Sequence, residues 1–325
     1  MVGWLDRLQR RNRGVGLVVA VIYKYLDDQG GYLAALITYY AFVSLFPLLL
    51  LLTTGLGVLL RGRPDLQAQV LHSTLSQFPV IGSQLHQPEG LSGGTVAVVV
   101  GILGALYGGL GVGQAVQNAM DSVWAVPKHA RRDPIRSRKH SLILLLVLGS
   151  AAIATTVLSA VGHVTGSLGV VGKLGVTVIT VCMNAVICLV LFRVTTAREL
   201  TYRQVLPGAL AGALIWQVLQ WFGAGYIGHV VKTSSATNSV FALVLGMLAF
   251  LFLISSTLVL CAEINVVLVE QLHPRALLTP FTDDVDLTPA DRKTYTRKAK
   301  AERVKGFQRV SVKFSDLHRK ETHAP

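Results

Sequence analysis

Long apolar segments alternate with short polar and basic segments along most of the chain. Six of the apolar segments are long enough to cross a bilayer as helices, for which about 20 residues suffice. They are predicted at residues 33–60, 95–118, 141–163, 174–193, 205–228 and 240–268. A shorter apolar stretch at 15–26 precedes them, and we predict that it lies along the membrane surface as an interfacial helix.

Lysine and arginine in the polar segments predict the orientation of these spans. Every second polar segment, counted from the N-terminal one, is rich in them, and together these segments hold 26 of the 30 such residues. Because basic loops stay on the cytoplasmic side, both termini are predicted to be cytoplasmic. The predicted fold is therefore an all-α integral membrane bundle of six transmembrane helices, with short interfacial helices beside it.

Three parts follow along the chain. Residues 1–32 form a cytoplasmic N-terminus with the interfacial helix, and residues 33–270 form the six-helix transmembrane domain. Residues 271–325 form a basic cytoplasmic tail that is too polar to have its own core. We expect partial helix at 288–304 and disorder at the end of the tail.

Composition supports a membrane protein and narrows its partners. Charged residues make up 14% of the chain, against about 25% in soluble domains, and the mean hydropathy is +0.54. A net charge of +13 could indicate nucleic-acid binding, but the charge lies in the loops and tails. Membrane topology and attraction to anionic lipids at the cytoplasmic face explain it more simply. The expected partners are the bilayer and its anionic lipids and not nucleic acid, and the sequence does not indicate an oligomeric state.

One acidic residue, Glu263, lies inside the six predicted spans. A charge within hydrocarbon costs a few kcal/mol or more, so the side chain should face the bundle interior or a wet cavity. Its role is open between a structural contact, a substrate or proton site, and simple placement at the interface. Arg193 and Arg198, at the end of the fourth span, are the nearest strong bases at its predicted depth, and Asn265 lies on another face of the helix.

The second predicted span ends in a polar stripe. Its members follow the i, i+3, i+4, i+7 spacing of one helix face, and they are Gln114, Gln117, Asn118 and Asp121. They lie at the same predicted depth as Glu263. Together these residues could line a cavity in the cytoplasmic half of the bundle, or they could serve only as hydrogen bonds between helices.

The first predicted span contains a proline. Pro47 removes the hydrogen bond that would reach the carbonyl of Val43. Ser44 can donate to the carbonyl of Tyr40 and ease the bend. We therefore predict a kink around Tyr40, Ser44 and Pro47.

Glycines at GxxxG spacing recur in the predicted spans and favour close helix packing. The pairs are Gly104 with Gly108, Gly109 with Gly113, Gly162 with Gly166, and Gly208 with Gly212.

Catalytic motifs are missing from the sequence. The nine histidines form no HxH or HExxH motif, the three cysteines form no CxxC, and there is no P-loop or GxSxG sequence. We therefore predict no catalytic residue, no metal ligand and no cofactor, and we do not expect an enzyme.

Four segments together resemble the YihY / virulence-factor BrkB family, once labelled ribonuclease BN-like. They are TYYAFVSLFPLLLLLTT at 38–54, QNAMDSVWAV at 117–126, LPGALAGALIWQ at 206–217 and CAEIN at 261–265. The resemblance covers about residues 20–270, and the tail is similar to those of actinobacterial members. The chain departs from the family pattern at Cys261, where members usually have glycine.

The resemblance implies a six-helix protein of the bacterial inner membrane. We expect transport or flipping of a lipid-like or amphipathic solute in envelope maintenance. One alternative is a non-catalytic membrane scaffold that recruits partners through its basic tail. A membrane-bound ribonuclease is a third reading and is disfavoured, because the sequence offers no metal ligands.

Overall fold

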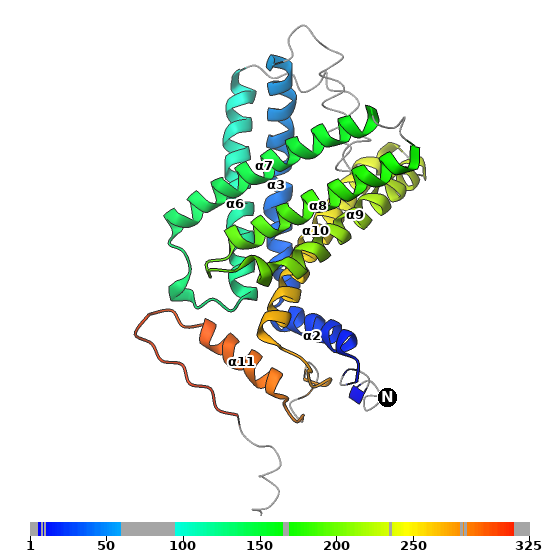
Figure 1. The fold of residues 1–325 in the computed structure, drawn as a ribbon. Helices are drawn as coiled ribbons and strands as arrows, with labels where there is room; N and C mark the ends of the chain where they lie inside the picture. Colours follow the sequence, from blue (N-terminus) through cyan, green and yellow to red (C-terminus); the bar gives the residue numbers. More distant parts are fainter. Residues whose placement is uncertain are drawn as a thin grey trace, which may run out of the picture.

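The computed structural model describes residues 6, 7, 9, 11–59, 95–164, 169–233, 236–279, 282 and 285–314. These residues form eight α-helices, a short 3-10 helix and no strand (Figure 1). The α-helices are α2 (Arg13–Asp27), α3 (Gly30–Leu59), α6 (Thr95–Val123), α7 (Pro134–Val164), α8 (Gly169–Thr195), α9 (Tyr202–Thr233), α10 (Ala236–Glu270) and α11 (Pro289–Ala301). The 3-10 helix is η2 (Lys128–Ala130). The all-α prediction is confirmed for the described residues.

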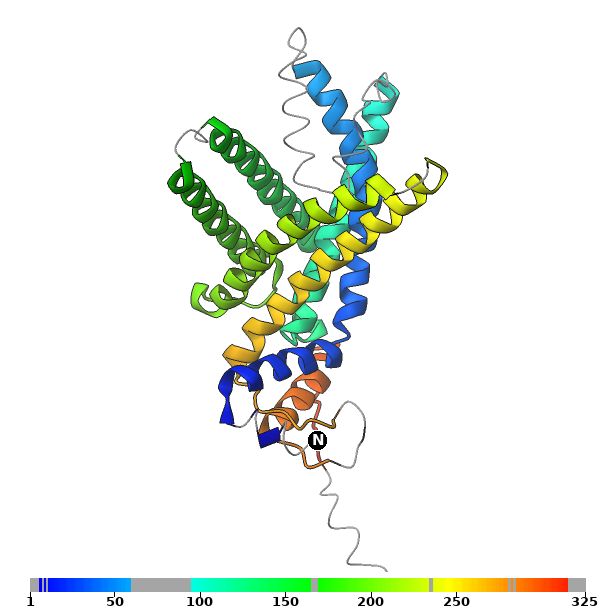
Figure 2. The ribbon, with the colours of Figure 1, turned by 90° about the vertical axis from the view of Figure 1, so that its right-hand side faces the viewer.

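Each predicted span coincides with one long helix, from α3 to α10. Helix α10 is the centre of the arrangement, because it packs against α3, α9, α2 and α6 (Figures 1 and 2). Helices α3 and α6 lie along each other, and α7 and α8 pair as a hairpin. The shorter helices α2 and α11 lie at one end of the long helices.

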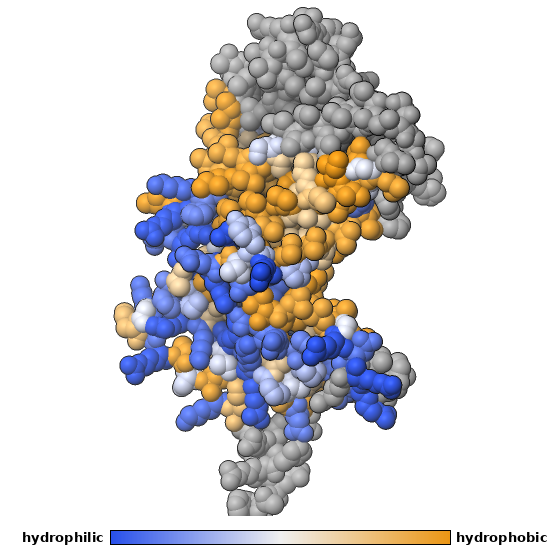
Figure 3. All heavy atoms as spheres, viewed as in Figure 1, coloured by the Kyte–Doolittle hydropathy of each residue, from blue (hydrophilic) through white to orange (hydrophobic). Residues whose placement is uncertain are grey.

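The long helices expose apolar side chains over much of their length. Two described segments are long and apolar enough to cross a membrane, Leu174–Thr195 and Val244–Glu270, each with a mean hydropathy of 2.5. Only 17% and 28% of these windows, respectively, are buried in the protein. Leu103 and Leu146, on two other helices, are 63% and 67% exposed. Figure 3 shows the result, an apolar surface above a hydrophilic end, and the six-span count itself stays a prediction.

Helices α3 and α6 approach closely because glycines of α6 lie opposite larger side chains of α3. A Cβ atom built on any of three α6 glycines would lie within 2.2–2.7 Å of an α3 side chain, which is closer than packed atoms come. The three contacts are Gly104 with Pro47, Gly108 with Ser44, and Gly111 with Tyr40. The predicted close packing at Gly104 and Gly108 is therefore confirmed, whereas Gly166 lies outside the described residues.

Helix α3 continues through Pro47 as a single helix. The Ser44 hydroxyl donates to the carbonyl of Ala41 at 2.9 Å, so the predicted acceptor, the carbonyl of Tyr40, is wrong. Both carbonyls are within reach of a helical hydroxyl, and the side-chain rotamer decides between them. The Tyr40 ring packs instead on Gly111 and forms an edge-on contact with Tyr39.

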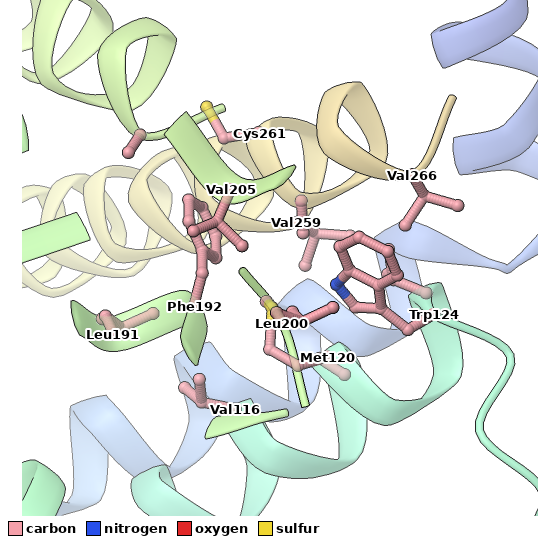
Figure 4. Close-up of a cluster of buried hydrophobic side chains, with 14 of the residues drawn as sticks. Val116, Met120, Trp124, Leu191, Phe192, Leu200, Val205, Val259, Cys261 and Val266 are labelled. Carbon is pink, nitrogen blue, oxygen red and sulfur yellow. The ribbon is translucent and has the colours of Figure 1, made fainter. Parts of the chain in front are cut away.

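A buried apolar cluster near the hydrophilic end of the molecule has members on every described α-helix except α11 (Figure 4). It packs these helices against one another near the point where their polar residues begin. Its labelled members are Val116, Met120, Trp124, Leu191, Phe192, Leu200, Val205, Val259, Cys261 and Val266.

We predict that Gly108→Ala lowers the stability of the protein by about 1–3 kcal/mol, because the added methyl group overpacks the contact with Ser44. The measurement is denaturant unfolding in detergent. The matched control is Gly149→Ala in α7, where an added Cβ meets nothing within 4 Å. Equal stability of the two variants would contradict the close packing of α3 on α6.

Candidate functional site

Glu263 of α10 is fully buried near the hydrophilic end of the bundle, beside a lysine from α2. The Lys24 Nζ atom lies 3.4 Å from Glu263 Oε2. The same ammonium forms an ion pair with Asp28, the residue that follows α2, and donates to the carbonyl of Val123 at 3.1 Å. Asp28 is itself only 8% exposed, so one ammonium lies between two buried carboxylates.

Helix α2 presents Lys24 to α10 because of the spacing of its residues. Its buried positions are Gly16, Ala20, Val21 and Lys24, which share one helix face. The Asn12 side chain accepts a hydrogen bond from the backbone of Gly14 and caps the helix at its start. Burial alone would lower the pKa of Lys24, but the carboxylates of Glu263 and Asp28 outweigh it and the pKa is raised.

A second buried ion cluster fastens the tail to α2. Arg275 is fully buried, and its guanidinium forms ion pairs with Asp27 at 2.7 Å and with Asp291. Asp291 also accepts from the backbone of Ala276 at 3.0 Å and forms a reciprocal capping box with Thr288 at the start of α11. Burial would lower the pKa of Arg275, but the bonds to Asp27 and Asp291 raise it. Helix α11 is therefore held by the charge that also holds α2.

Glu270, at the end of α10, forms the third cluster. It pairs with Arg198 at 3.0 Å, with Lys293 at 3.3 Å and with Arg297. Arg297 also donates to the carbonyl of Trp124 at 3.1 Å. These contacts hold α11 against the ends of the long helices, so α11 covers the ion clusters at this end of the molecule.

Two cavities lie between α11 and the long helices. One has a volume of about 260 Å³ and adjoins the buried ion pair; its lining includes Lys24, Asp28, Gln29, Ser122, Arg131, Thr294 and Lys298. The other has a volume of about 530 Å³, and its lining includes Trp124, Arg198, Glu270, Arg297 and Lys300. Basic side chains contribute to the lining of both cavities, and the larger one is also lined by apolar residues such as Val126 and Pro127.

A family model described as Virulence factor BrkB matches residues 21–283, which is most of the chain. The chain belongs to the BrkB (YihY/BrkB) family. The resemblance drawn from the sequence is thereby confirmed, and BrkB membership together with the two long apolar helices makes this a membrane protein. Searches of curated proteins and of solved structures found no match.

Arg193 and Arg198, the strong bases expected nearest to Glu263, do not pair with it in this BrkB chain. Arg193 is exposed, and its guanidinium lies 4.1 Å above the ring of Tyr202. Arg198 is exposed too and pairs with Glu270. The partner is Lys24, because α2 folds beneath the bundle and brings its buried face to α10.

The predicted polar stripe of α6 divides into a buried and an exposed row. Gln117 and Asp121 are buried, whereas Gln114 and Asn118 are exposed. Gln117 donates to the Ser141 hydroxyl of α7 at 2.9 Å. Each pair has i, i+4 spacing and so forms its own row along the helix. Because one row is buried and the other is exposed, the four side chains do not line one cavity.

The other polar residues of the predicted layer bond between segments. Asp121 accepts from the backbone of Ala197 at 2.7 Å, and Asn118 accepts from Arg131 at 2.9 Å. Asn265 is fully buried and accepts from the backbone of Gly208 at 2.7 Å, where α9 and α10 come close. These bonds favour the interhelical reading for these residues and leave Glu263 as the candidate site. Within the described residues, no group of three His, Cys, Asp or Glu side chains has an arrangement that could hold a metal ion.

Sequence reasoning missed four residues of the layer: Lys24, Asp28, Arg275 and Asp291. Lys24 counted only as a basic residue before the first span, although its spacing from Gly16 and Ala20 places it on the buried face of α2. A TPAD sequence at 288–291 carries the capping signal that marks the start of α11. No local pattern marks Arg275, because its partners are distant in sequence.

We predict that Lys24→Met destabilises the protein by about 3–5 kcal/mol at mildly alkaline pH, because two buried carboxylates lose their shared cation. The measurement is denaturant unfolding in detergent. Arg193→Met is the control and should cost at most about 1 kcal/mol, since the Arg193 guanidinium is exposed above an aromatic ring. Similar losses in the two variants would remove Lys24 from the role described here.

Proposed function

We propose that the chain is a multi-pass protein of the bacterial inner membrane, with six transmembrane helices and cytoplasmic termini, that moves a lipid-like or amphipathic solute between the leaflets. The orientation rests on the segregation of lysine and arginine into alternate segments. In this orientation the layer formed by α2 and α11 lies at the cytoplasmic end.

The buried pair of Glu263 and Lys24 is the observation that carries the proposal. Two charged groups removed from water stabilise a protein poorly, and apolar side chains of similar size would serve packing as well. An ionisable group within a membrane helix is therefore a functional candidate. Lys24 and Asp28 also line a polar cavity of about 260 Å³ that opens beneath this pair.

The shape of the surroundings suits an amphipathic solute. Polar and basic side chains line the cavities at the end of the bundle, including Arg131, Arg198 and Lys300. Apolar side chains such as Leu103 and Leu146 face outward on the long helices above them. A polar head group would bind in the basic layer while acyl chains remain along the apolar helix faces.

The scaffold alternative gains less from the structure. It needs basic side chains of the tail that are free to recruit partners. Lys293 and Arg297 pair with Glu270, and Lys298 approaches Asp28 at 3.8 Å, so these bases neutralise the bundle's own acids. We therefore favour solute movement over recruitment by the tail.

We predict that single cysteines report opposite sides of the membrane in a background lacking Cys182, Cys188 and Cys261. An impermeant thiol reagent added to intact cells should label Gln84→Cys and leave Thr201→Cys unlabelled until the cells are permeabilised. Both positions lie in polar connections between predicted spans. Equal labelling of the two in intact cells would overturn the proposed topology.

We predict that purified protein in proteoliposomes accelerates the transbilayer movement of fluorescent phospholipids. Dithionite bleaches the outer leaflet alone in protein-free vesicles, and bleaching should extend to the inner-leaflet fraction when the protein is present. Gly149→Ala, which changes no contact within 4 Å, should behave as the wild type. Folded protein that leaves bleaching at the protein-free level for both zwitterionic and anionic phospholipids would count against the proposal.

A further inference from the structure

The charges around Glu263 do not balance. Glu263 and Asp28 share the single ammonium of Lys24, and all three side chains are nearly or fully buried. Lys298 also approaches Asp28, but at 3.8 Å and with 48% of its side chain exposed, so water screens it. Asp27, the other acid at this end of α2, is paired with Arg275. The buried trio has one negative charge too many when both of its carboxyl groups are ionised.

The Glu263 carboxyl group is also short of hydrogen bonds. Neither oxygen has a hydrogen-bond partner among the described residues, although Lys24 Nζ lies 3.4 Å from Oε2. The same ammonium bonds to Asp28 and to the carbonyl of Val123. A buried carboxylate in this position loses the bonds that it had in water, at a cost that a neutral carboxylic acid largely avoids.

This asymmetry is what a protonated Glu263 would produce. With Glu263 neutral, Lys24 and Asp28 form a complete ion pair and no excess charge remains. With Glu263 ionised, it competes with Asp28 for the ammonium. The closer contact of Lys24 with Asp28 therefore fits the protonated state.

A cavity reaches two members of this trio, Lys24 and Asp28. The cavity of about 260 Å³ is lined by Lys24 and Asp28 together with Gln29, Ser122 and Arg131. It is polar and has room for several water molecules, each of which needs only about 10–15 Å³ of such space. Protons can thus reach Asp28 and Lys24 from the side on which α2 and α11 lie.

From these observations we infer that Glu263 is a proton-binding site, loaded through the cavity beside Asp28 and Lys24. An acid in the cavity water releases the proton, an O–H bond forms at the Glu263 carboxyl group, and no other covalent bond changes. The inference rests on the proposed function, to which it adds a coupling ion: the proton. Binding neutralises Glu263 and returns Lys24 wholly to Asp28, so it changes the contact between α10 and α2.

The charged and polar groups near Glu263 come from α2 and α6, which pack against α10, and from the more distant α11. Helix α2 contributes Lys24, Asp28 and, at longer range, Asp27. The end of α6 contributes the Val123 carbonyl, which holds the Lys24 ammonium. Helix α11 contributes Lys298 through Asp28.

Labelling with dicyclohexylcarbodiimide tests the site in the full-length protein. This apolar reagent adds to protonated carboxyl groups in apolar surroundings, and peptide mass spectrometry locates the adduct. We expect an adduct on Glu263 whose rate of formation falls as pH rises, in proportion to the protonated fraction. The exposed Glu199, modified by a water-soluble carbodiimide, is the control for reagent activity.

A variant separates proton binding from a purely structural charge. Asp28→Asn frees Lys24 for Glu263, so Glu263 should ionise more readily and its labelling at a given pH should fall several-fold. Glu263→Gln should abolish the adduct. No adduct on Glu263 at any pH, or labelling that is independent of pH, would overturn the inference.

The two proposals fail separately. Phospholipid movement by a protein whose Glu263 never reacts would refute the proton site and leave the proposed function standing. A pH-dependent adduct on Glu263 in a protein that moves no lipid would refute the proposed function and support the proton site.

Discussion

A carboxylate buried in a membrane helix needs charge compensation, and much of the hydrophilic end of this protein follows from that need. Glu263 and Asp28 share the ammonium of Lys24, which holds α2 against α10. The neighbouring acid Asp27 requires Arg275, and Arg275 in turn requires Asp291, which caps α11. The N-terminal helix, the last long helix and the tail are thus linked by one series of buried charges.

Close helix packing supplies the rigid frame around this series. The glycines of α6 let α3 approach until side chain and backbone touch, and Gly208 lets α9 approach the backbone of Cys261 on α10. Such contacts replace the hydrophobic driving force, which is weak between helices surrounded by lipid. Among the described residues, the outer faces of the long helices are largely apolar and hydrophilic side chains gather at one end of the bundle.

The long helices could be predicted from the sequence because their signal is local. A run of about 20 apolar residues is visible without any knowledge of its neighbours, and glycine spacing likewise revealed the contact at Gly108. The partner of Glu263 could not be found in this way, since Lys24 lies near the other end of the chain. The count of basic residues had used Lys24 only as a charge of the cytoplasmic N-terminus, and only the folded arrangement shows that it is buried with Glu263.

The docking of α2 under α10 has a consequence for biosynthesis. Among Lys24, Asp28 and Glu263, Lys24 is translated first. Glu263 follows only when the last long helix is translated. Until then α2 has neither the buried carboxyl group of Glu263 nor the rest of α10 to pack against. The base of the protein is therefore assembled after insertion, and a truncated nascent chain would leave α2 undocked at the membrane surface, where quality-control proteases could reach it.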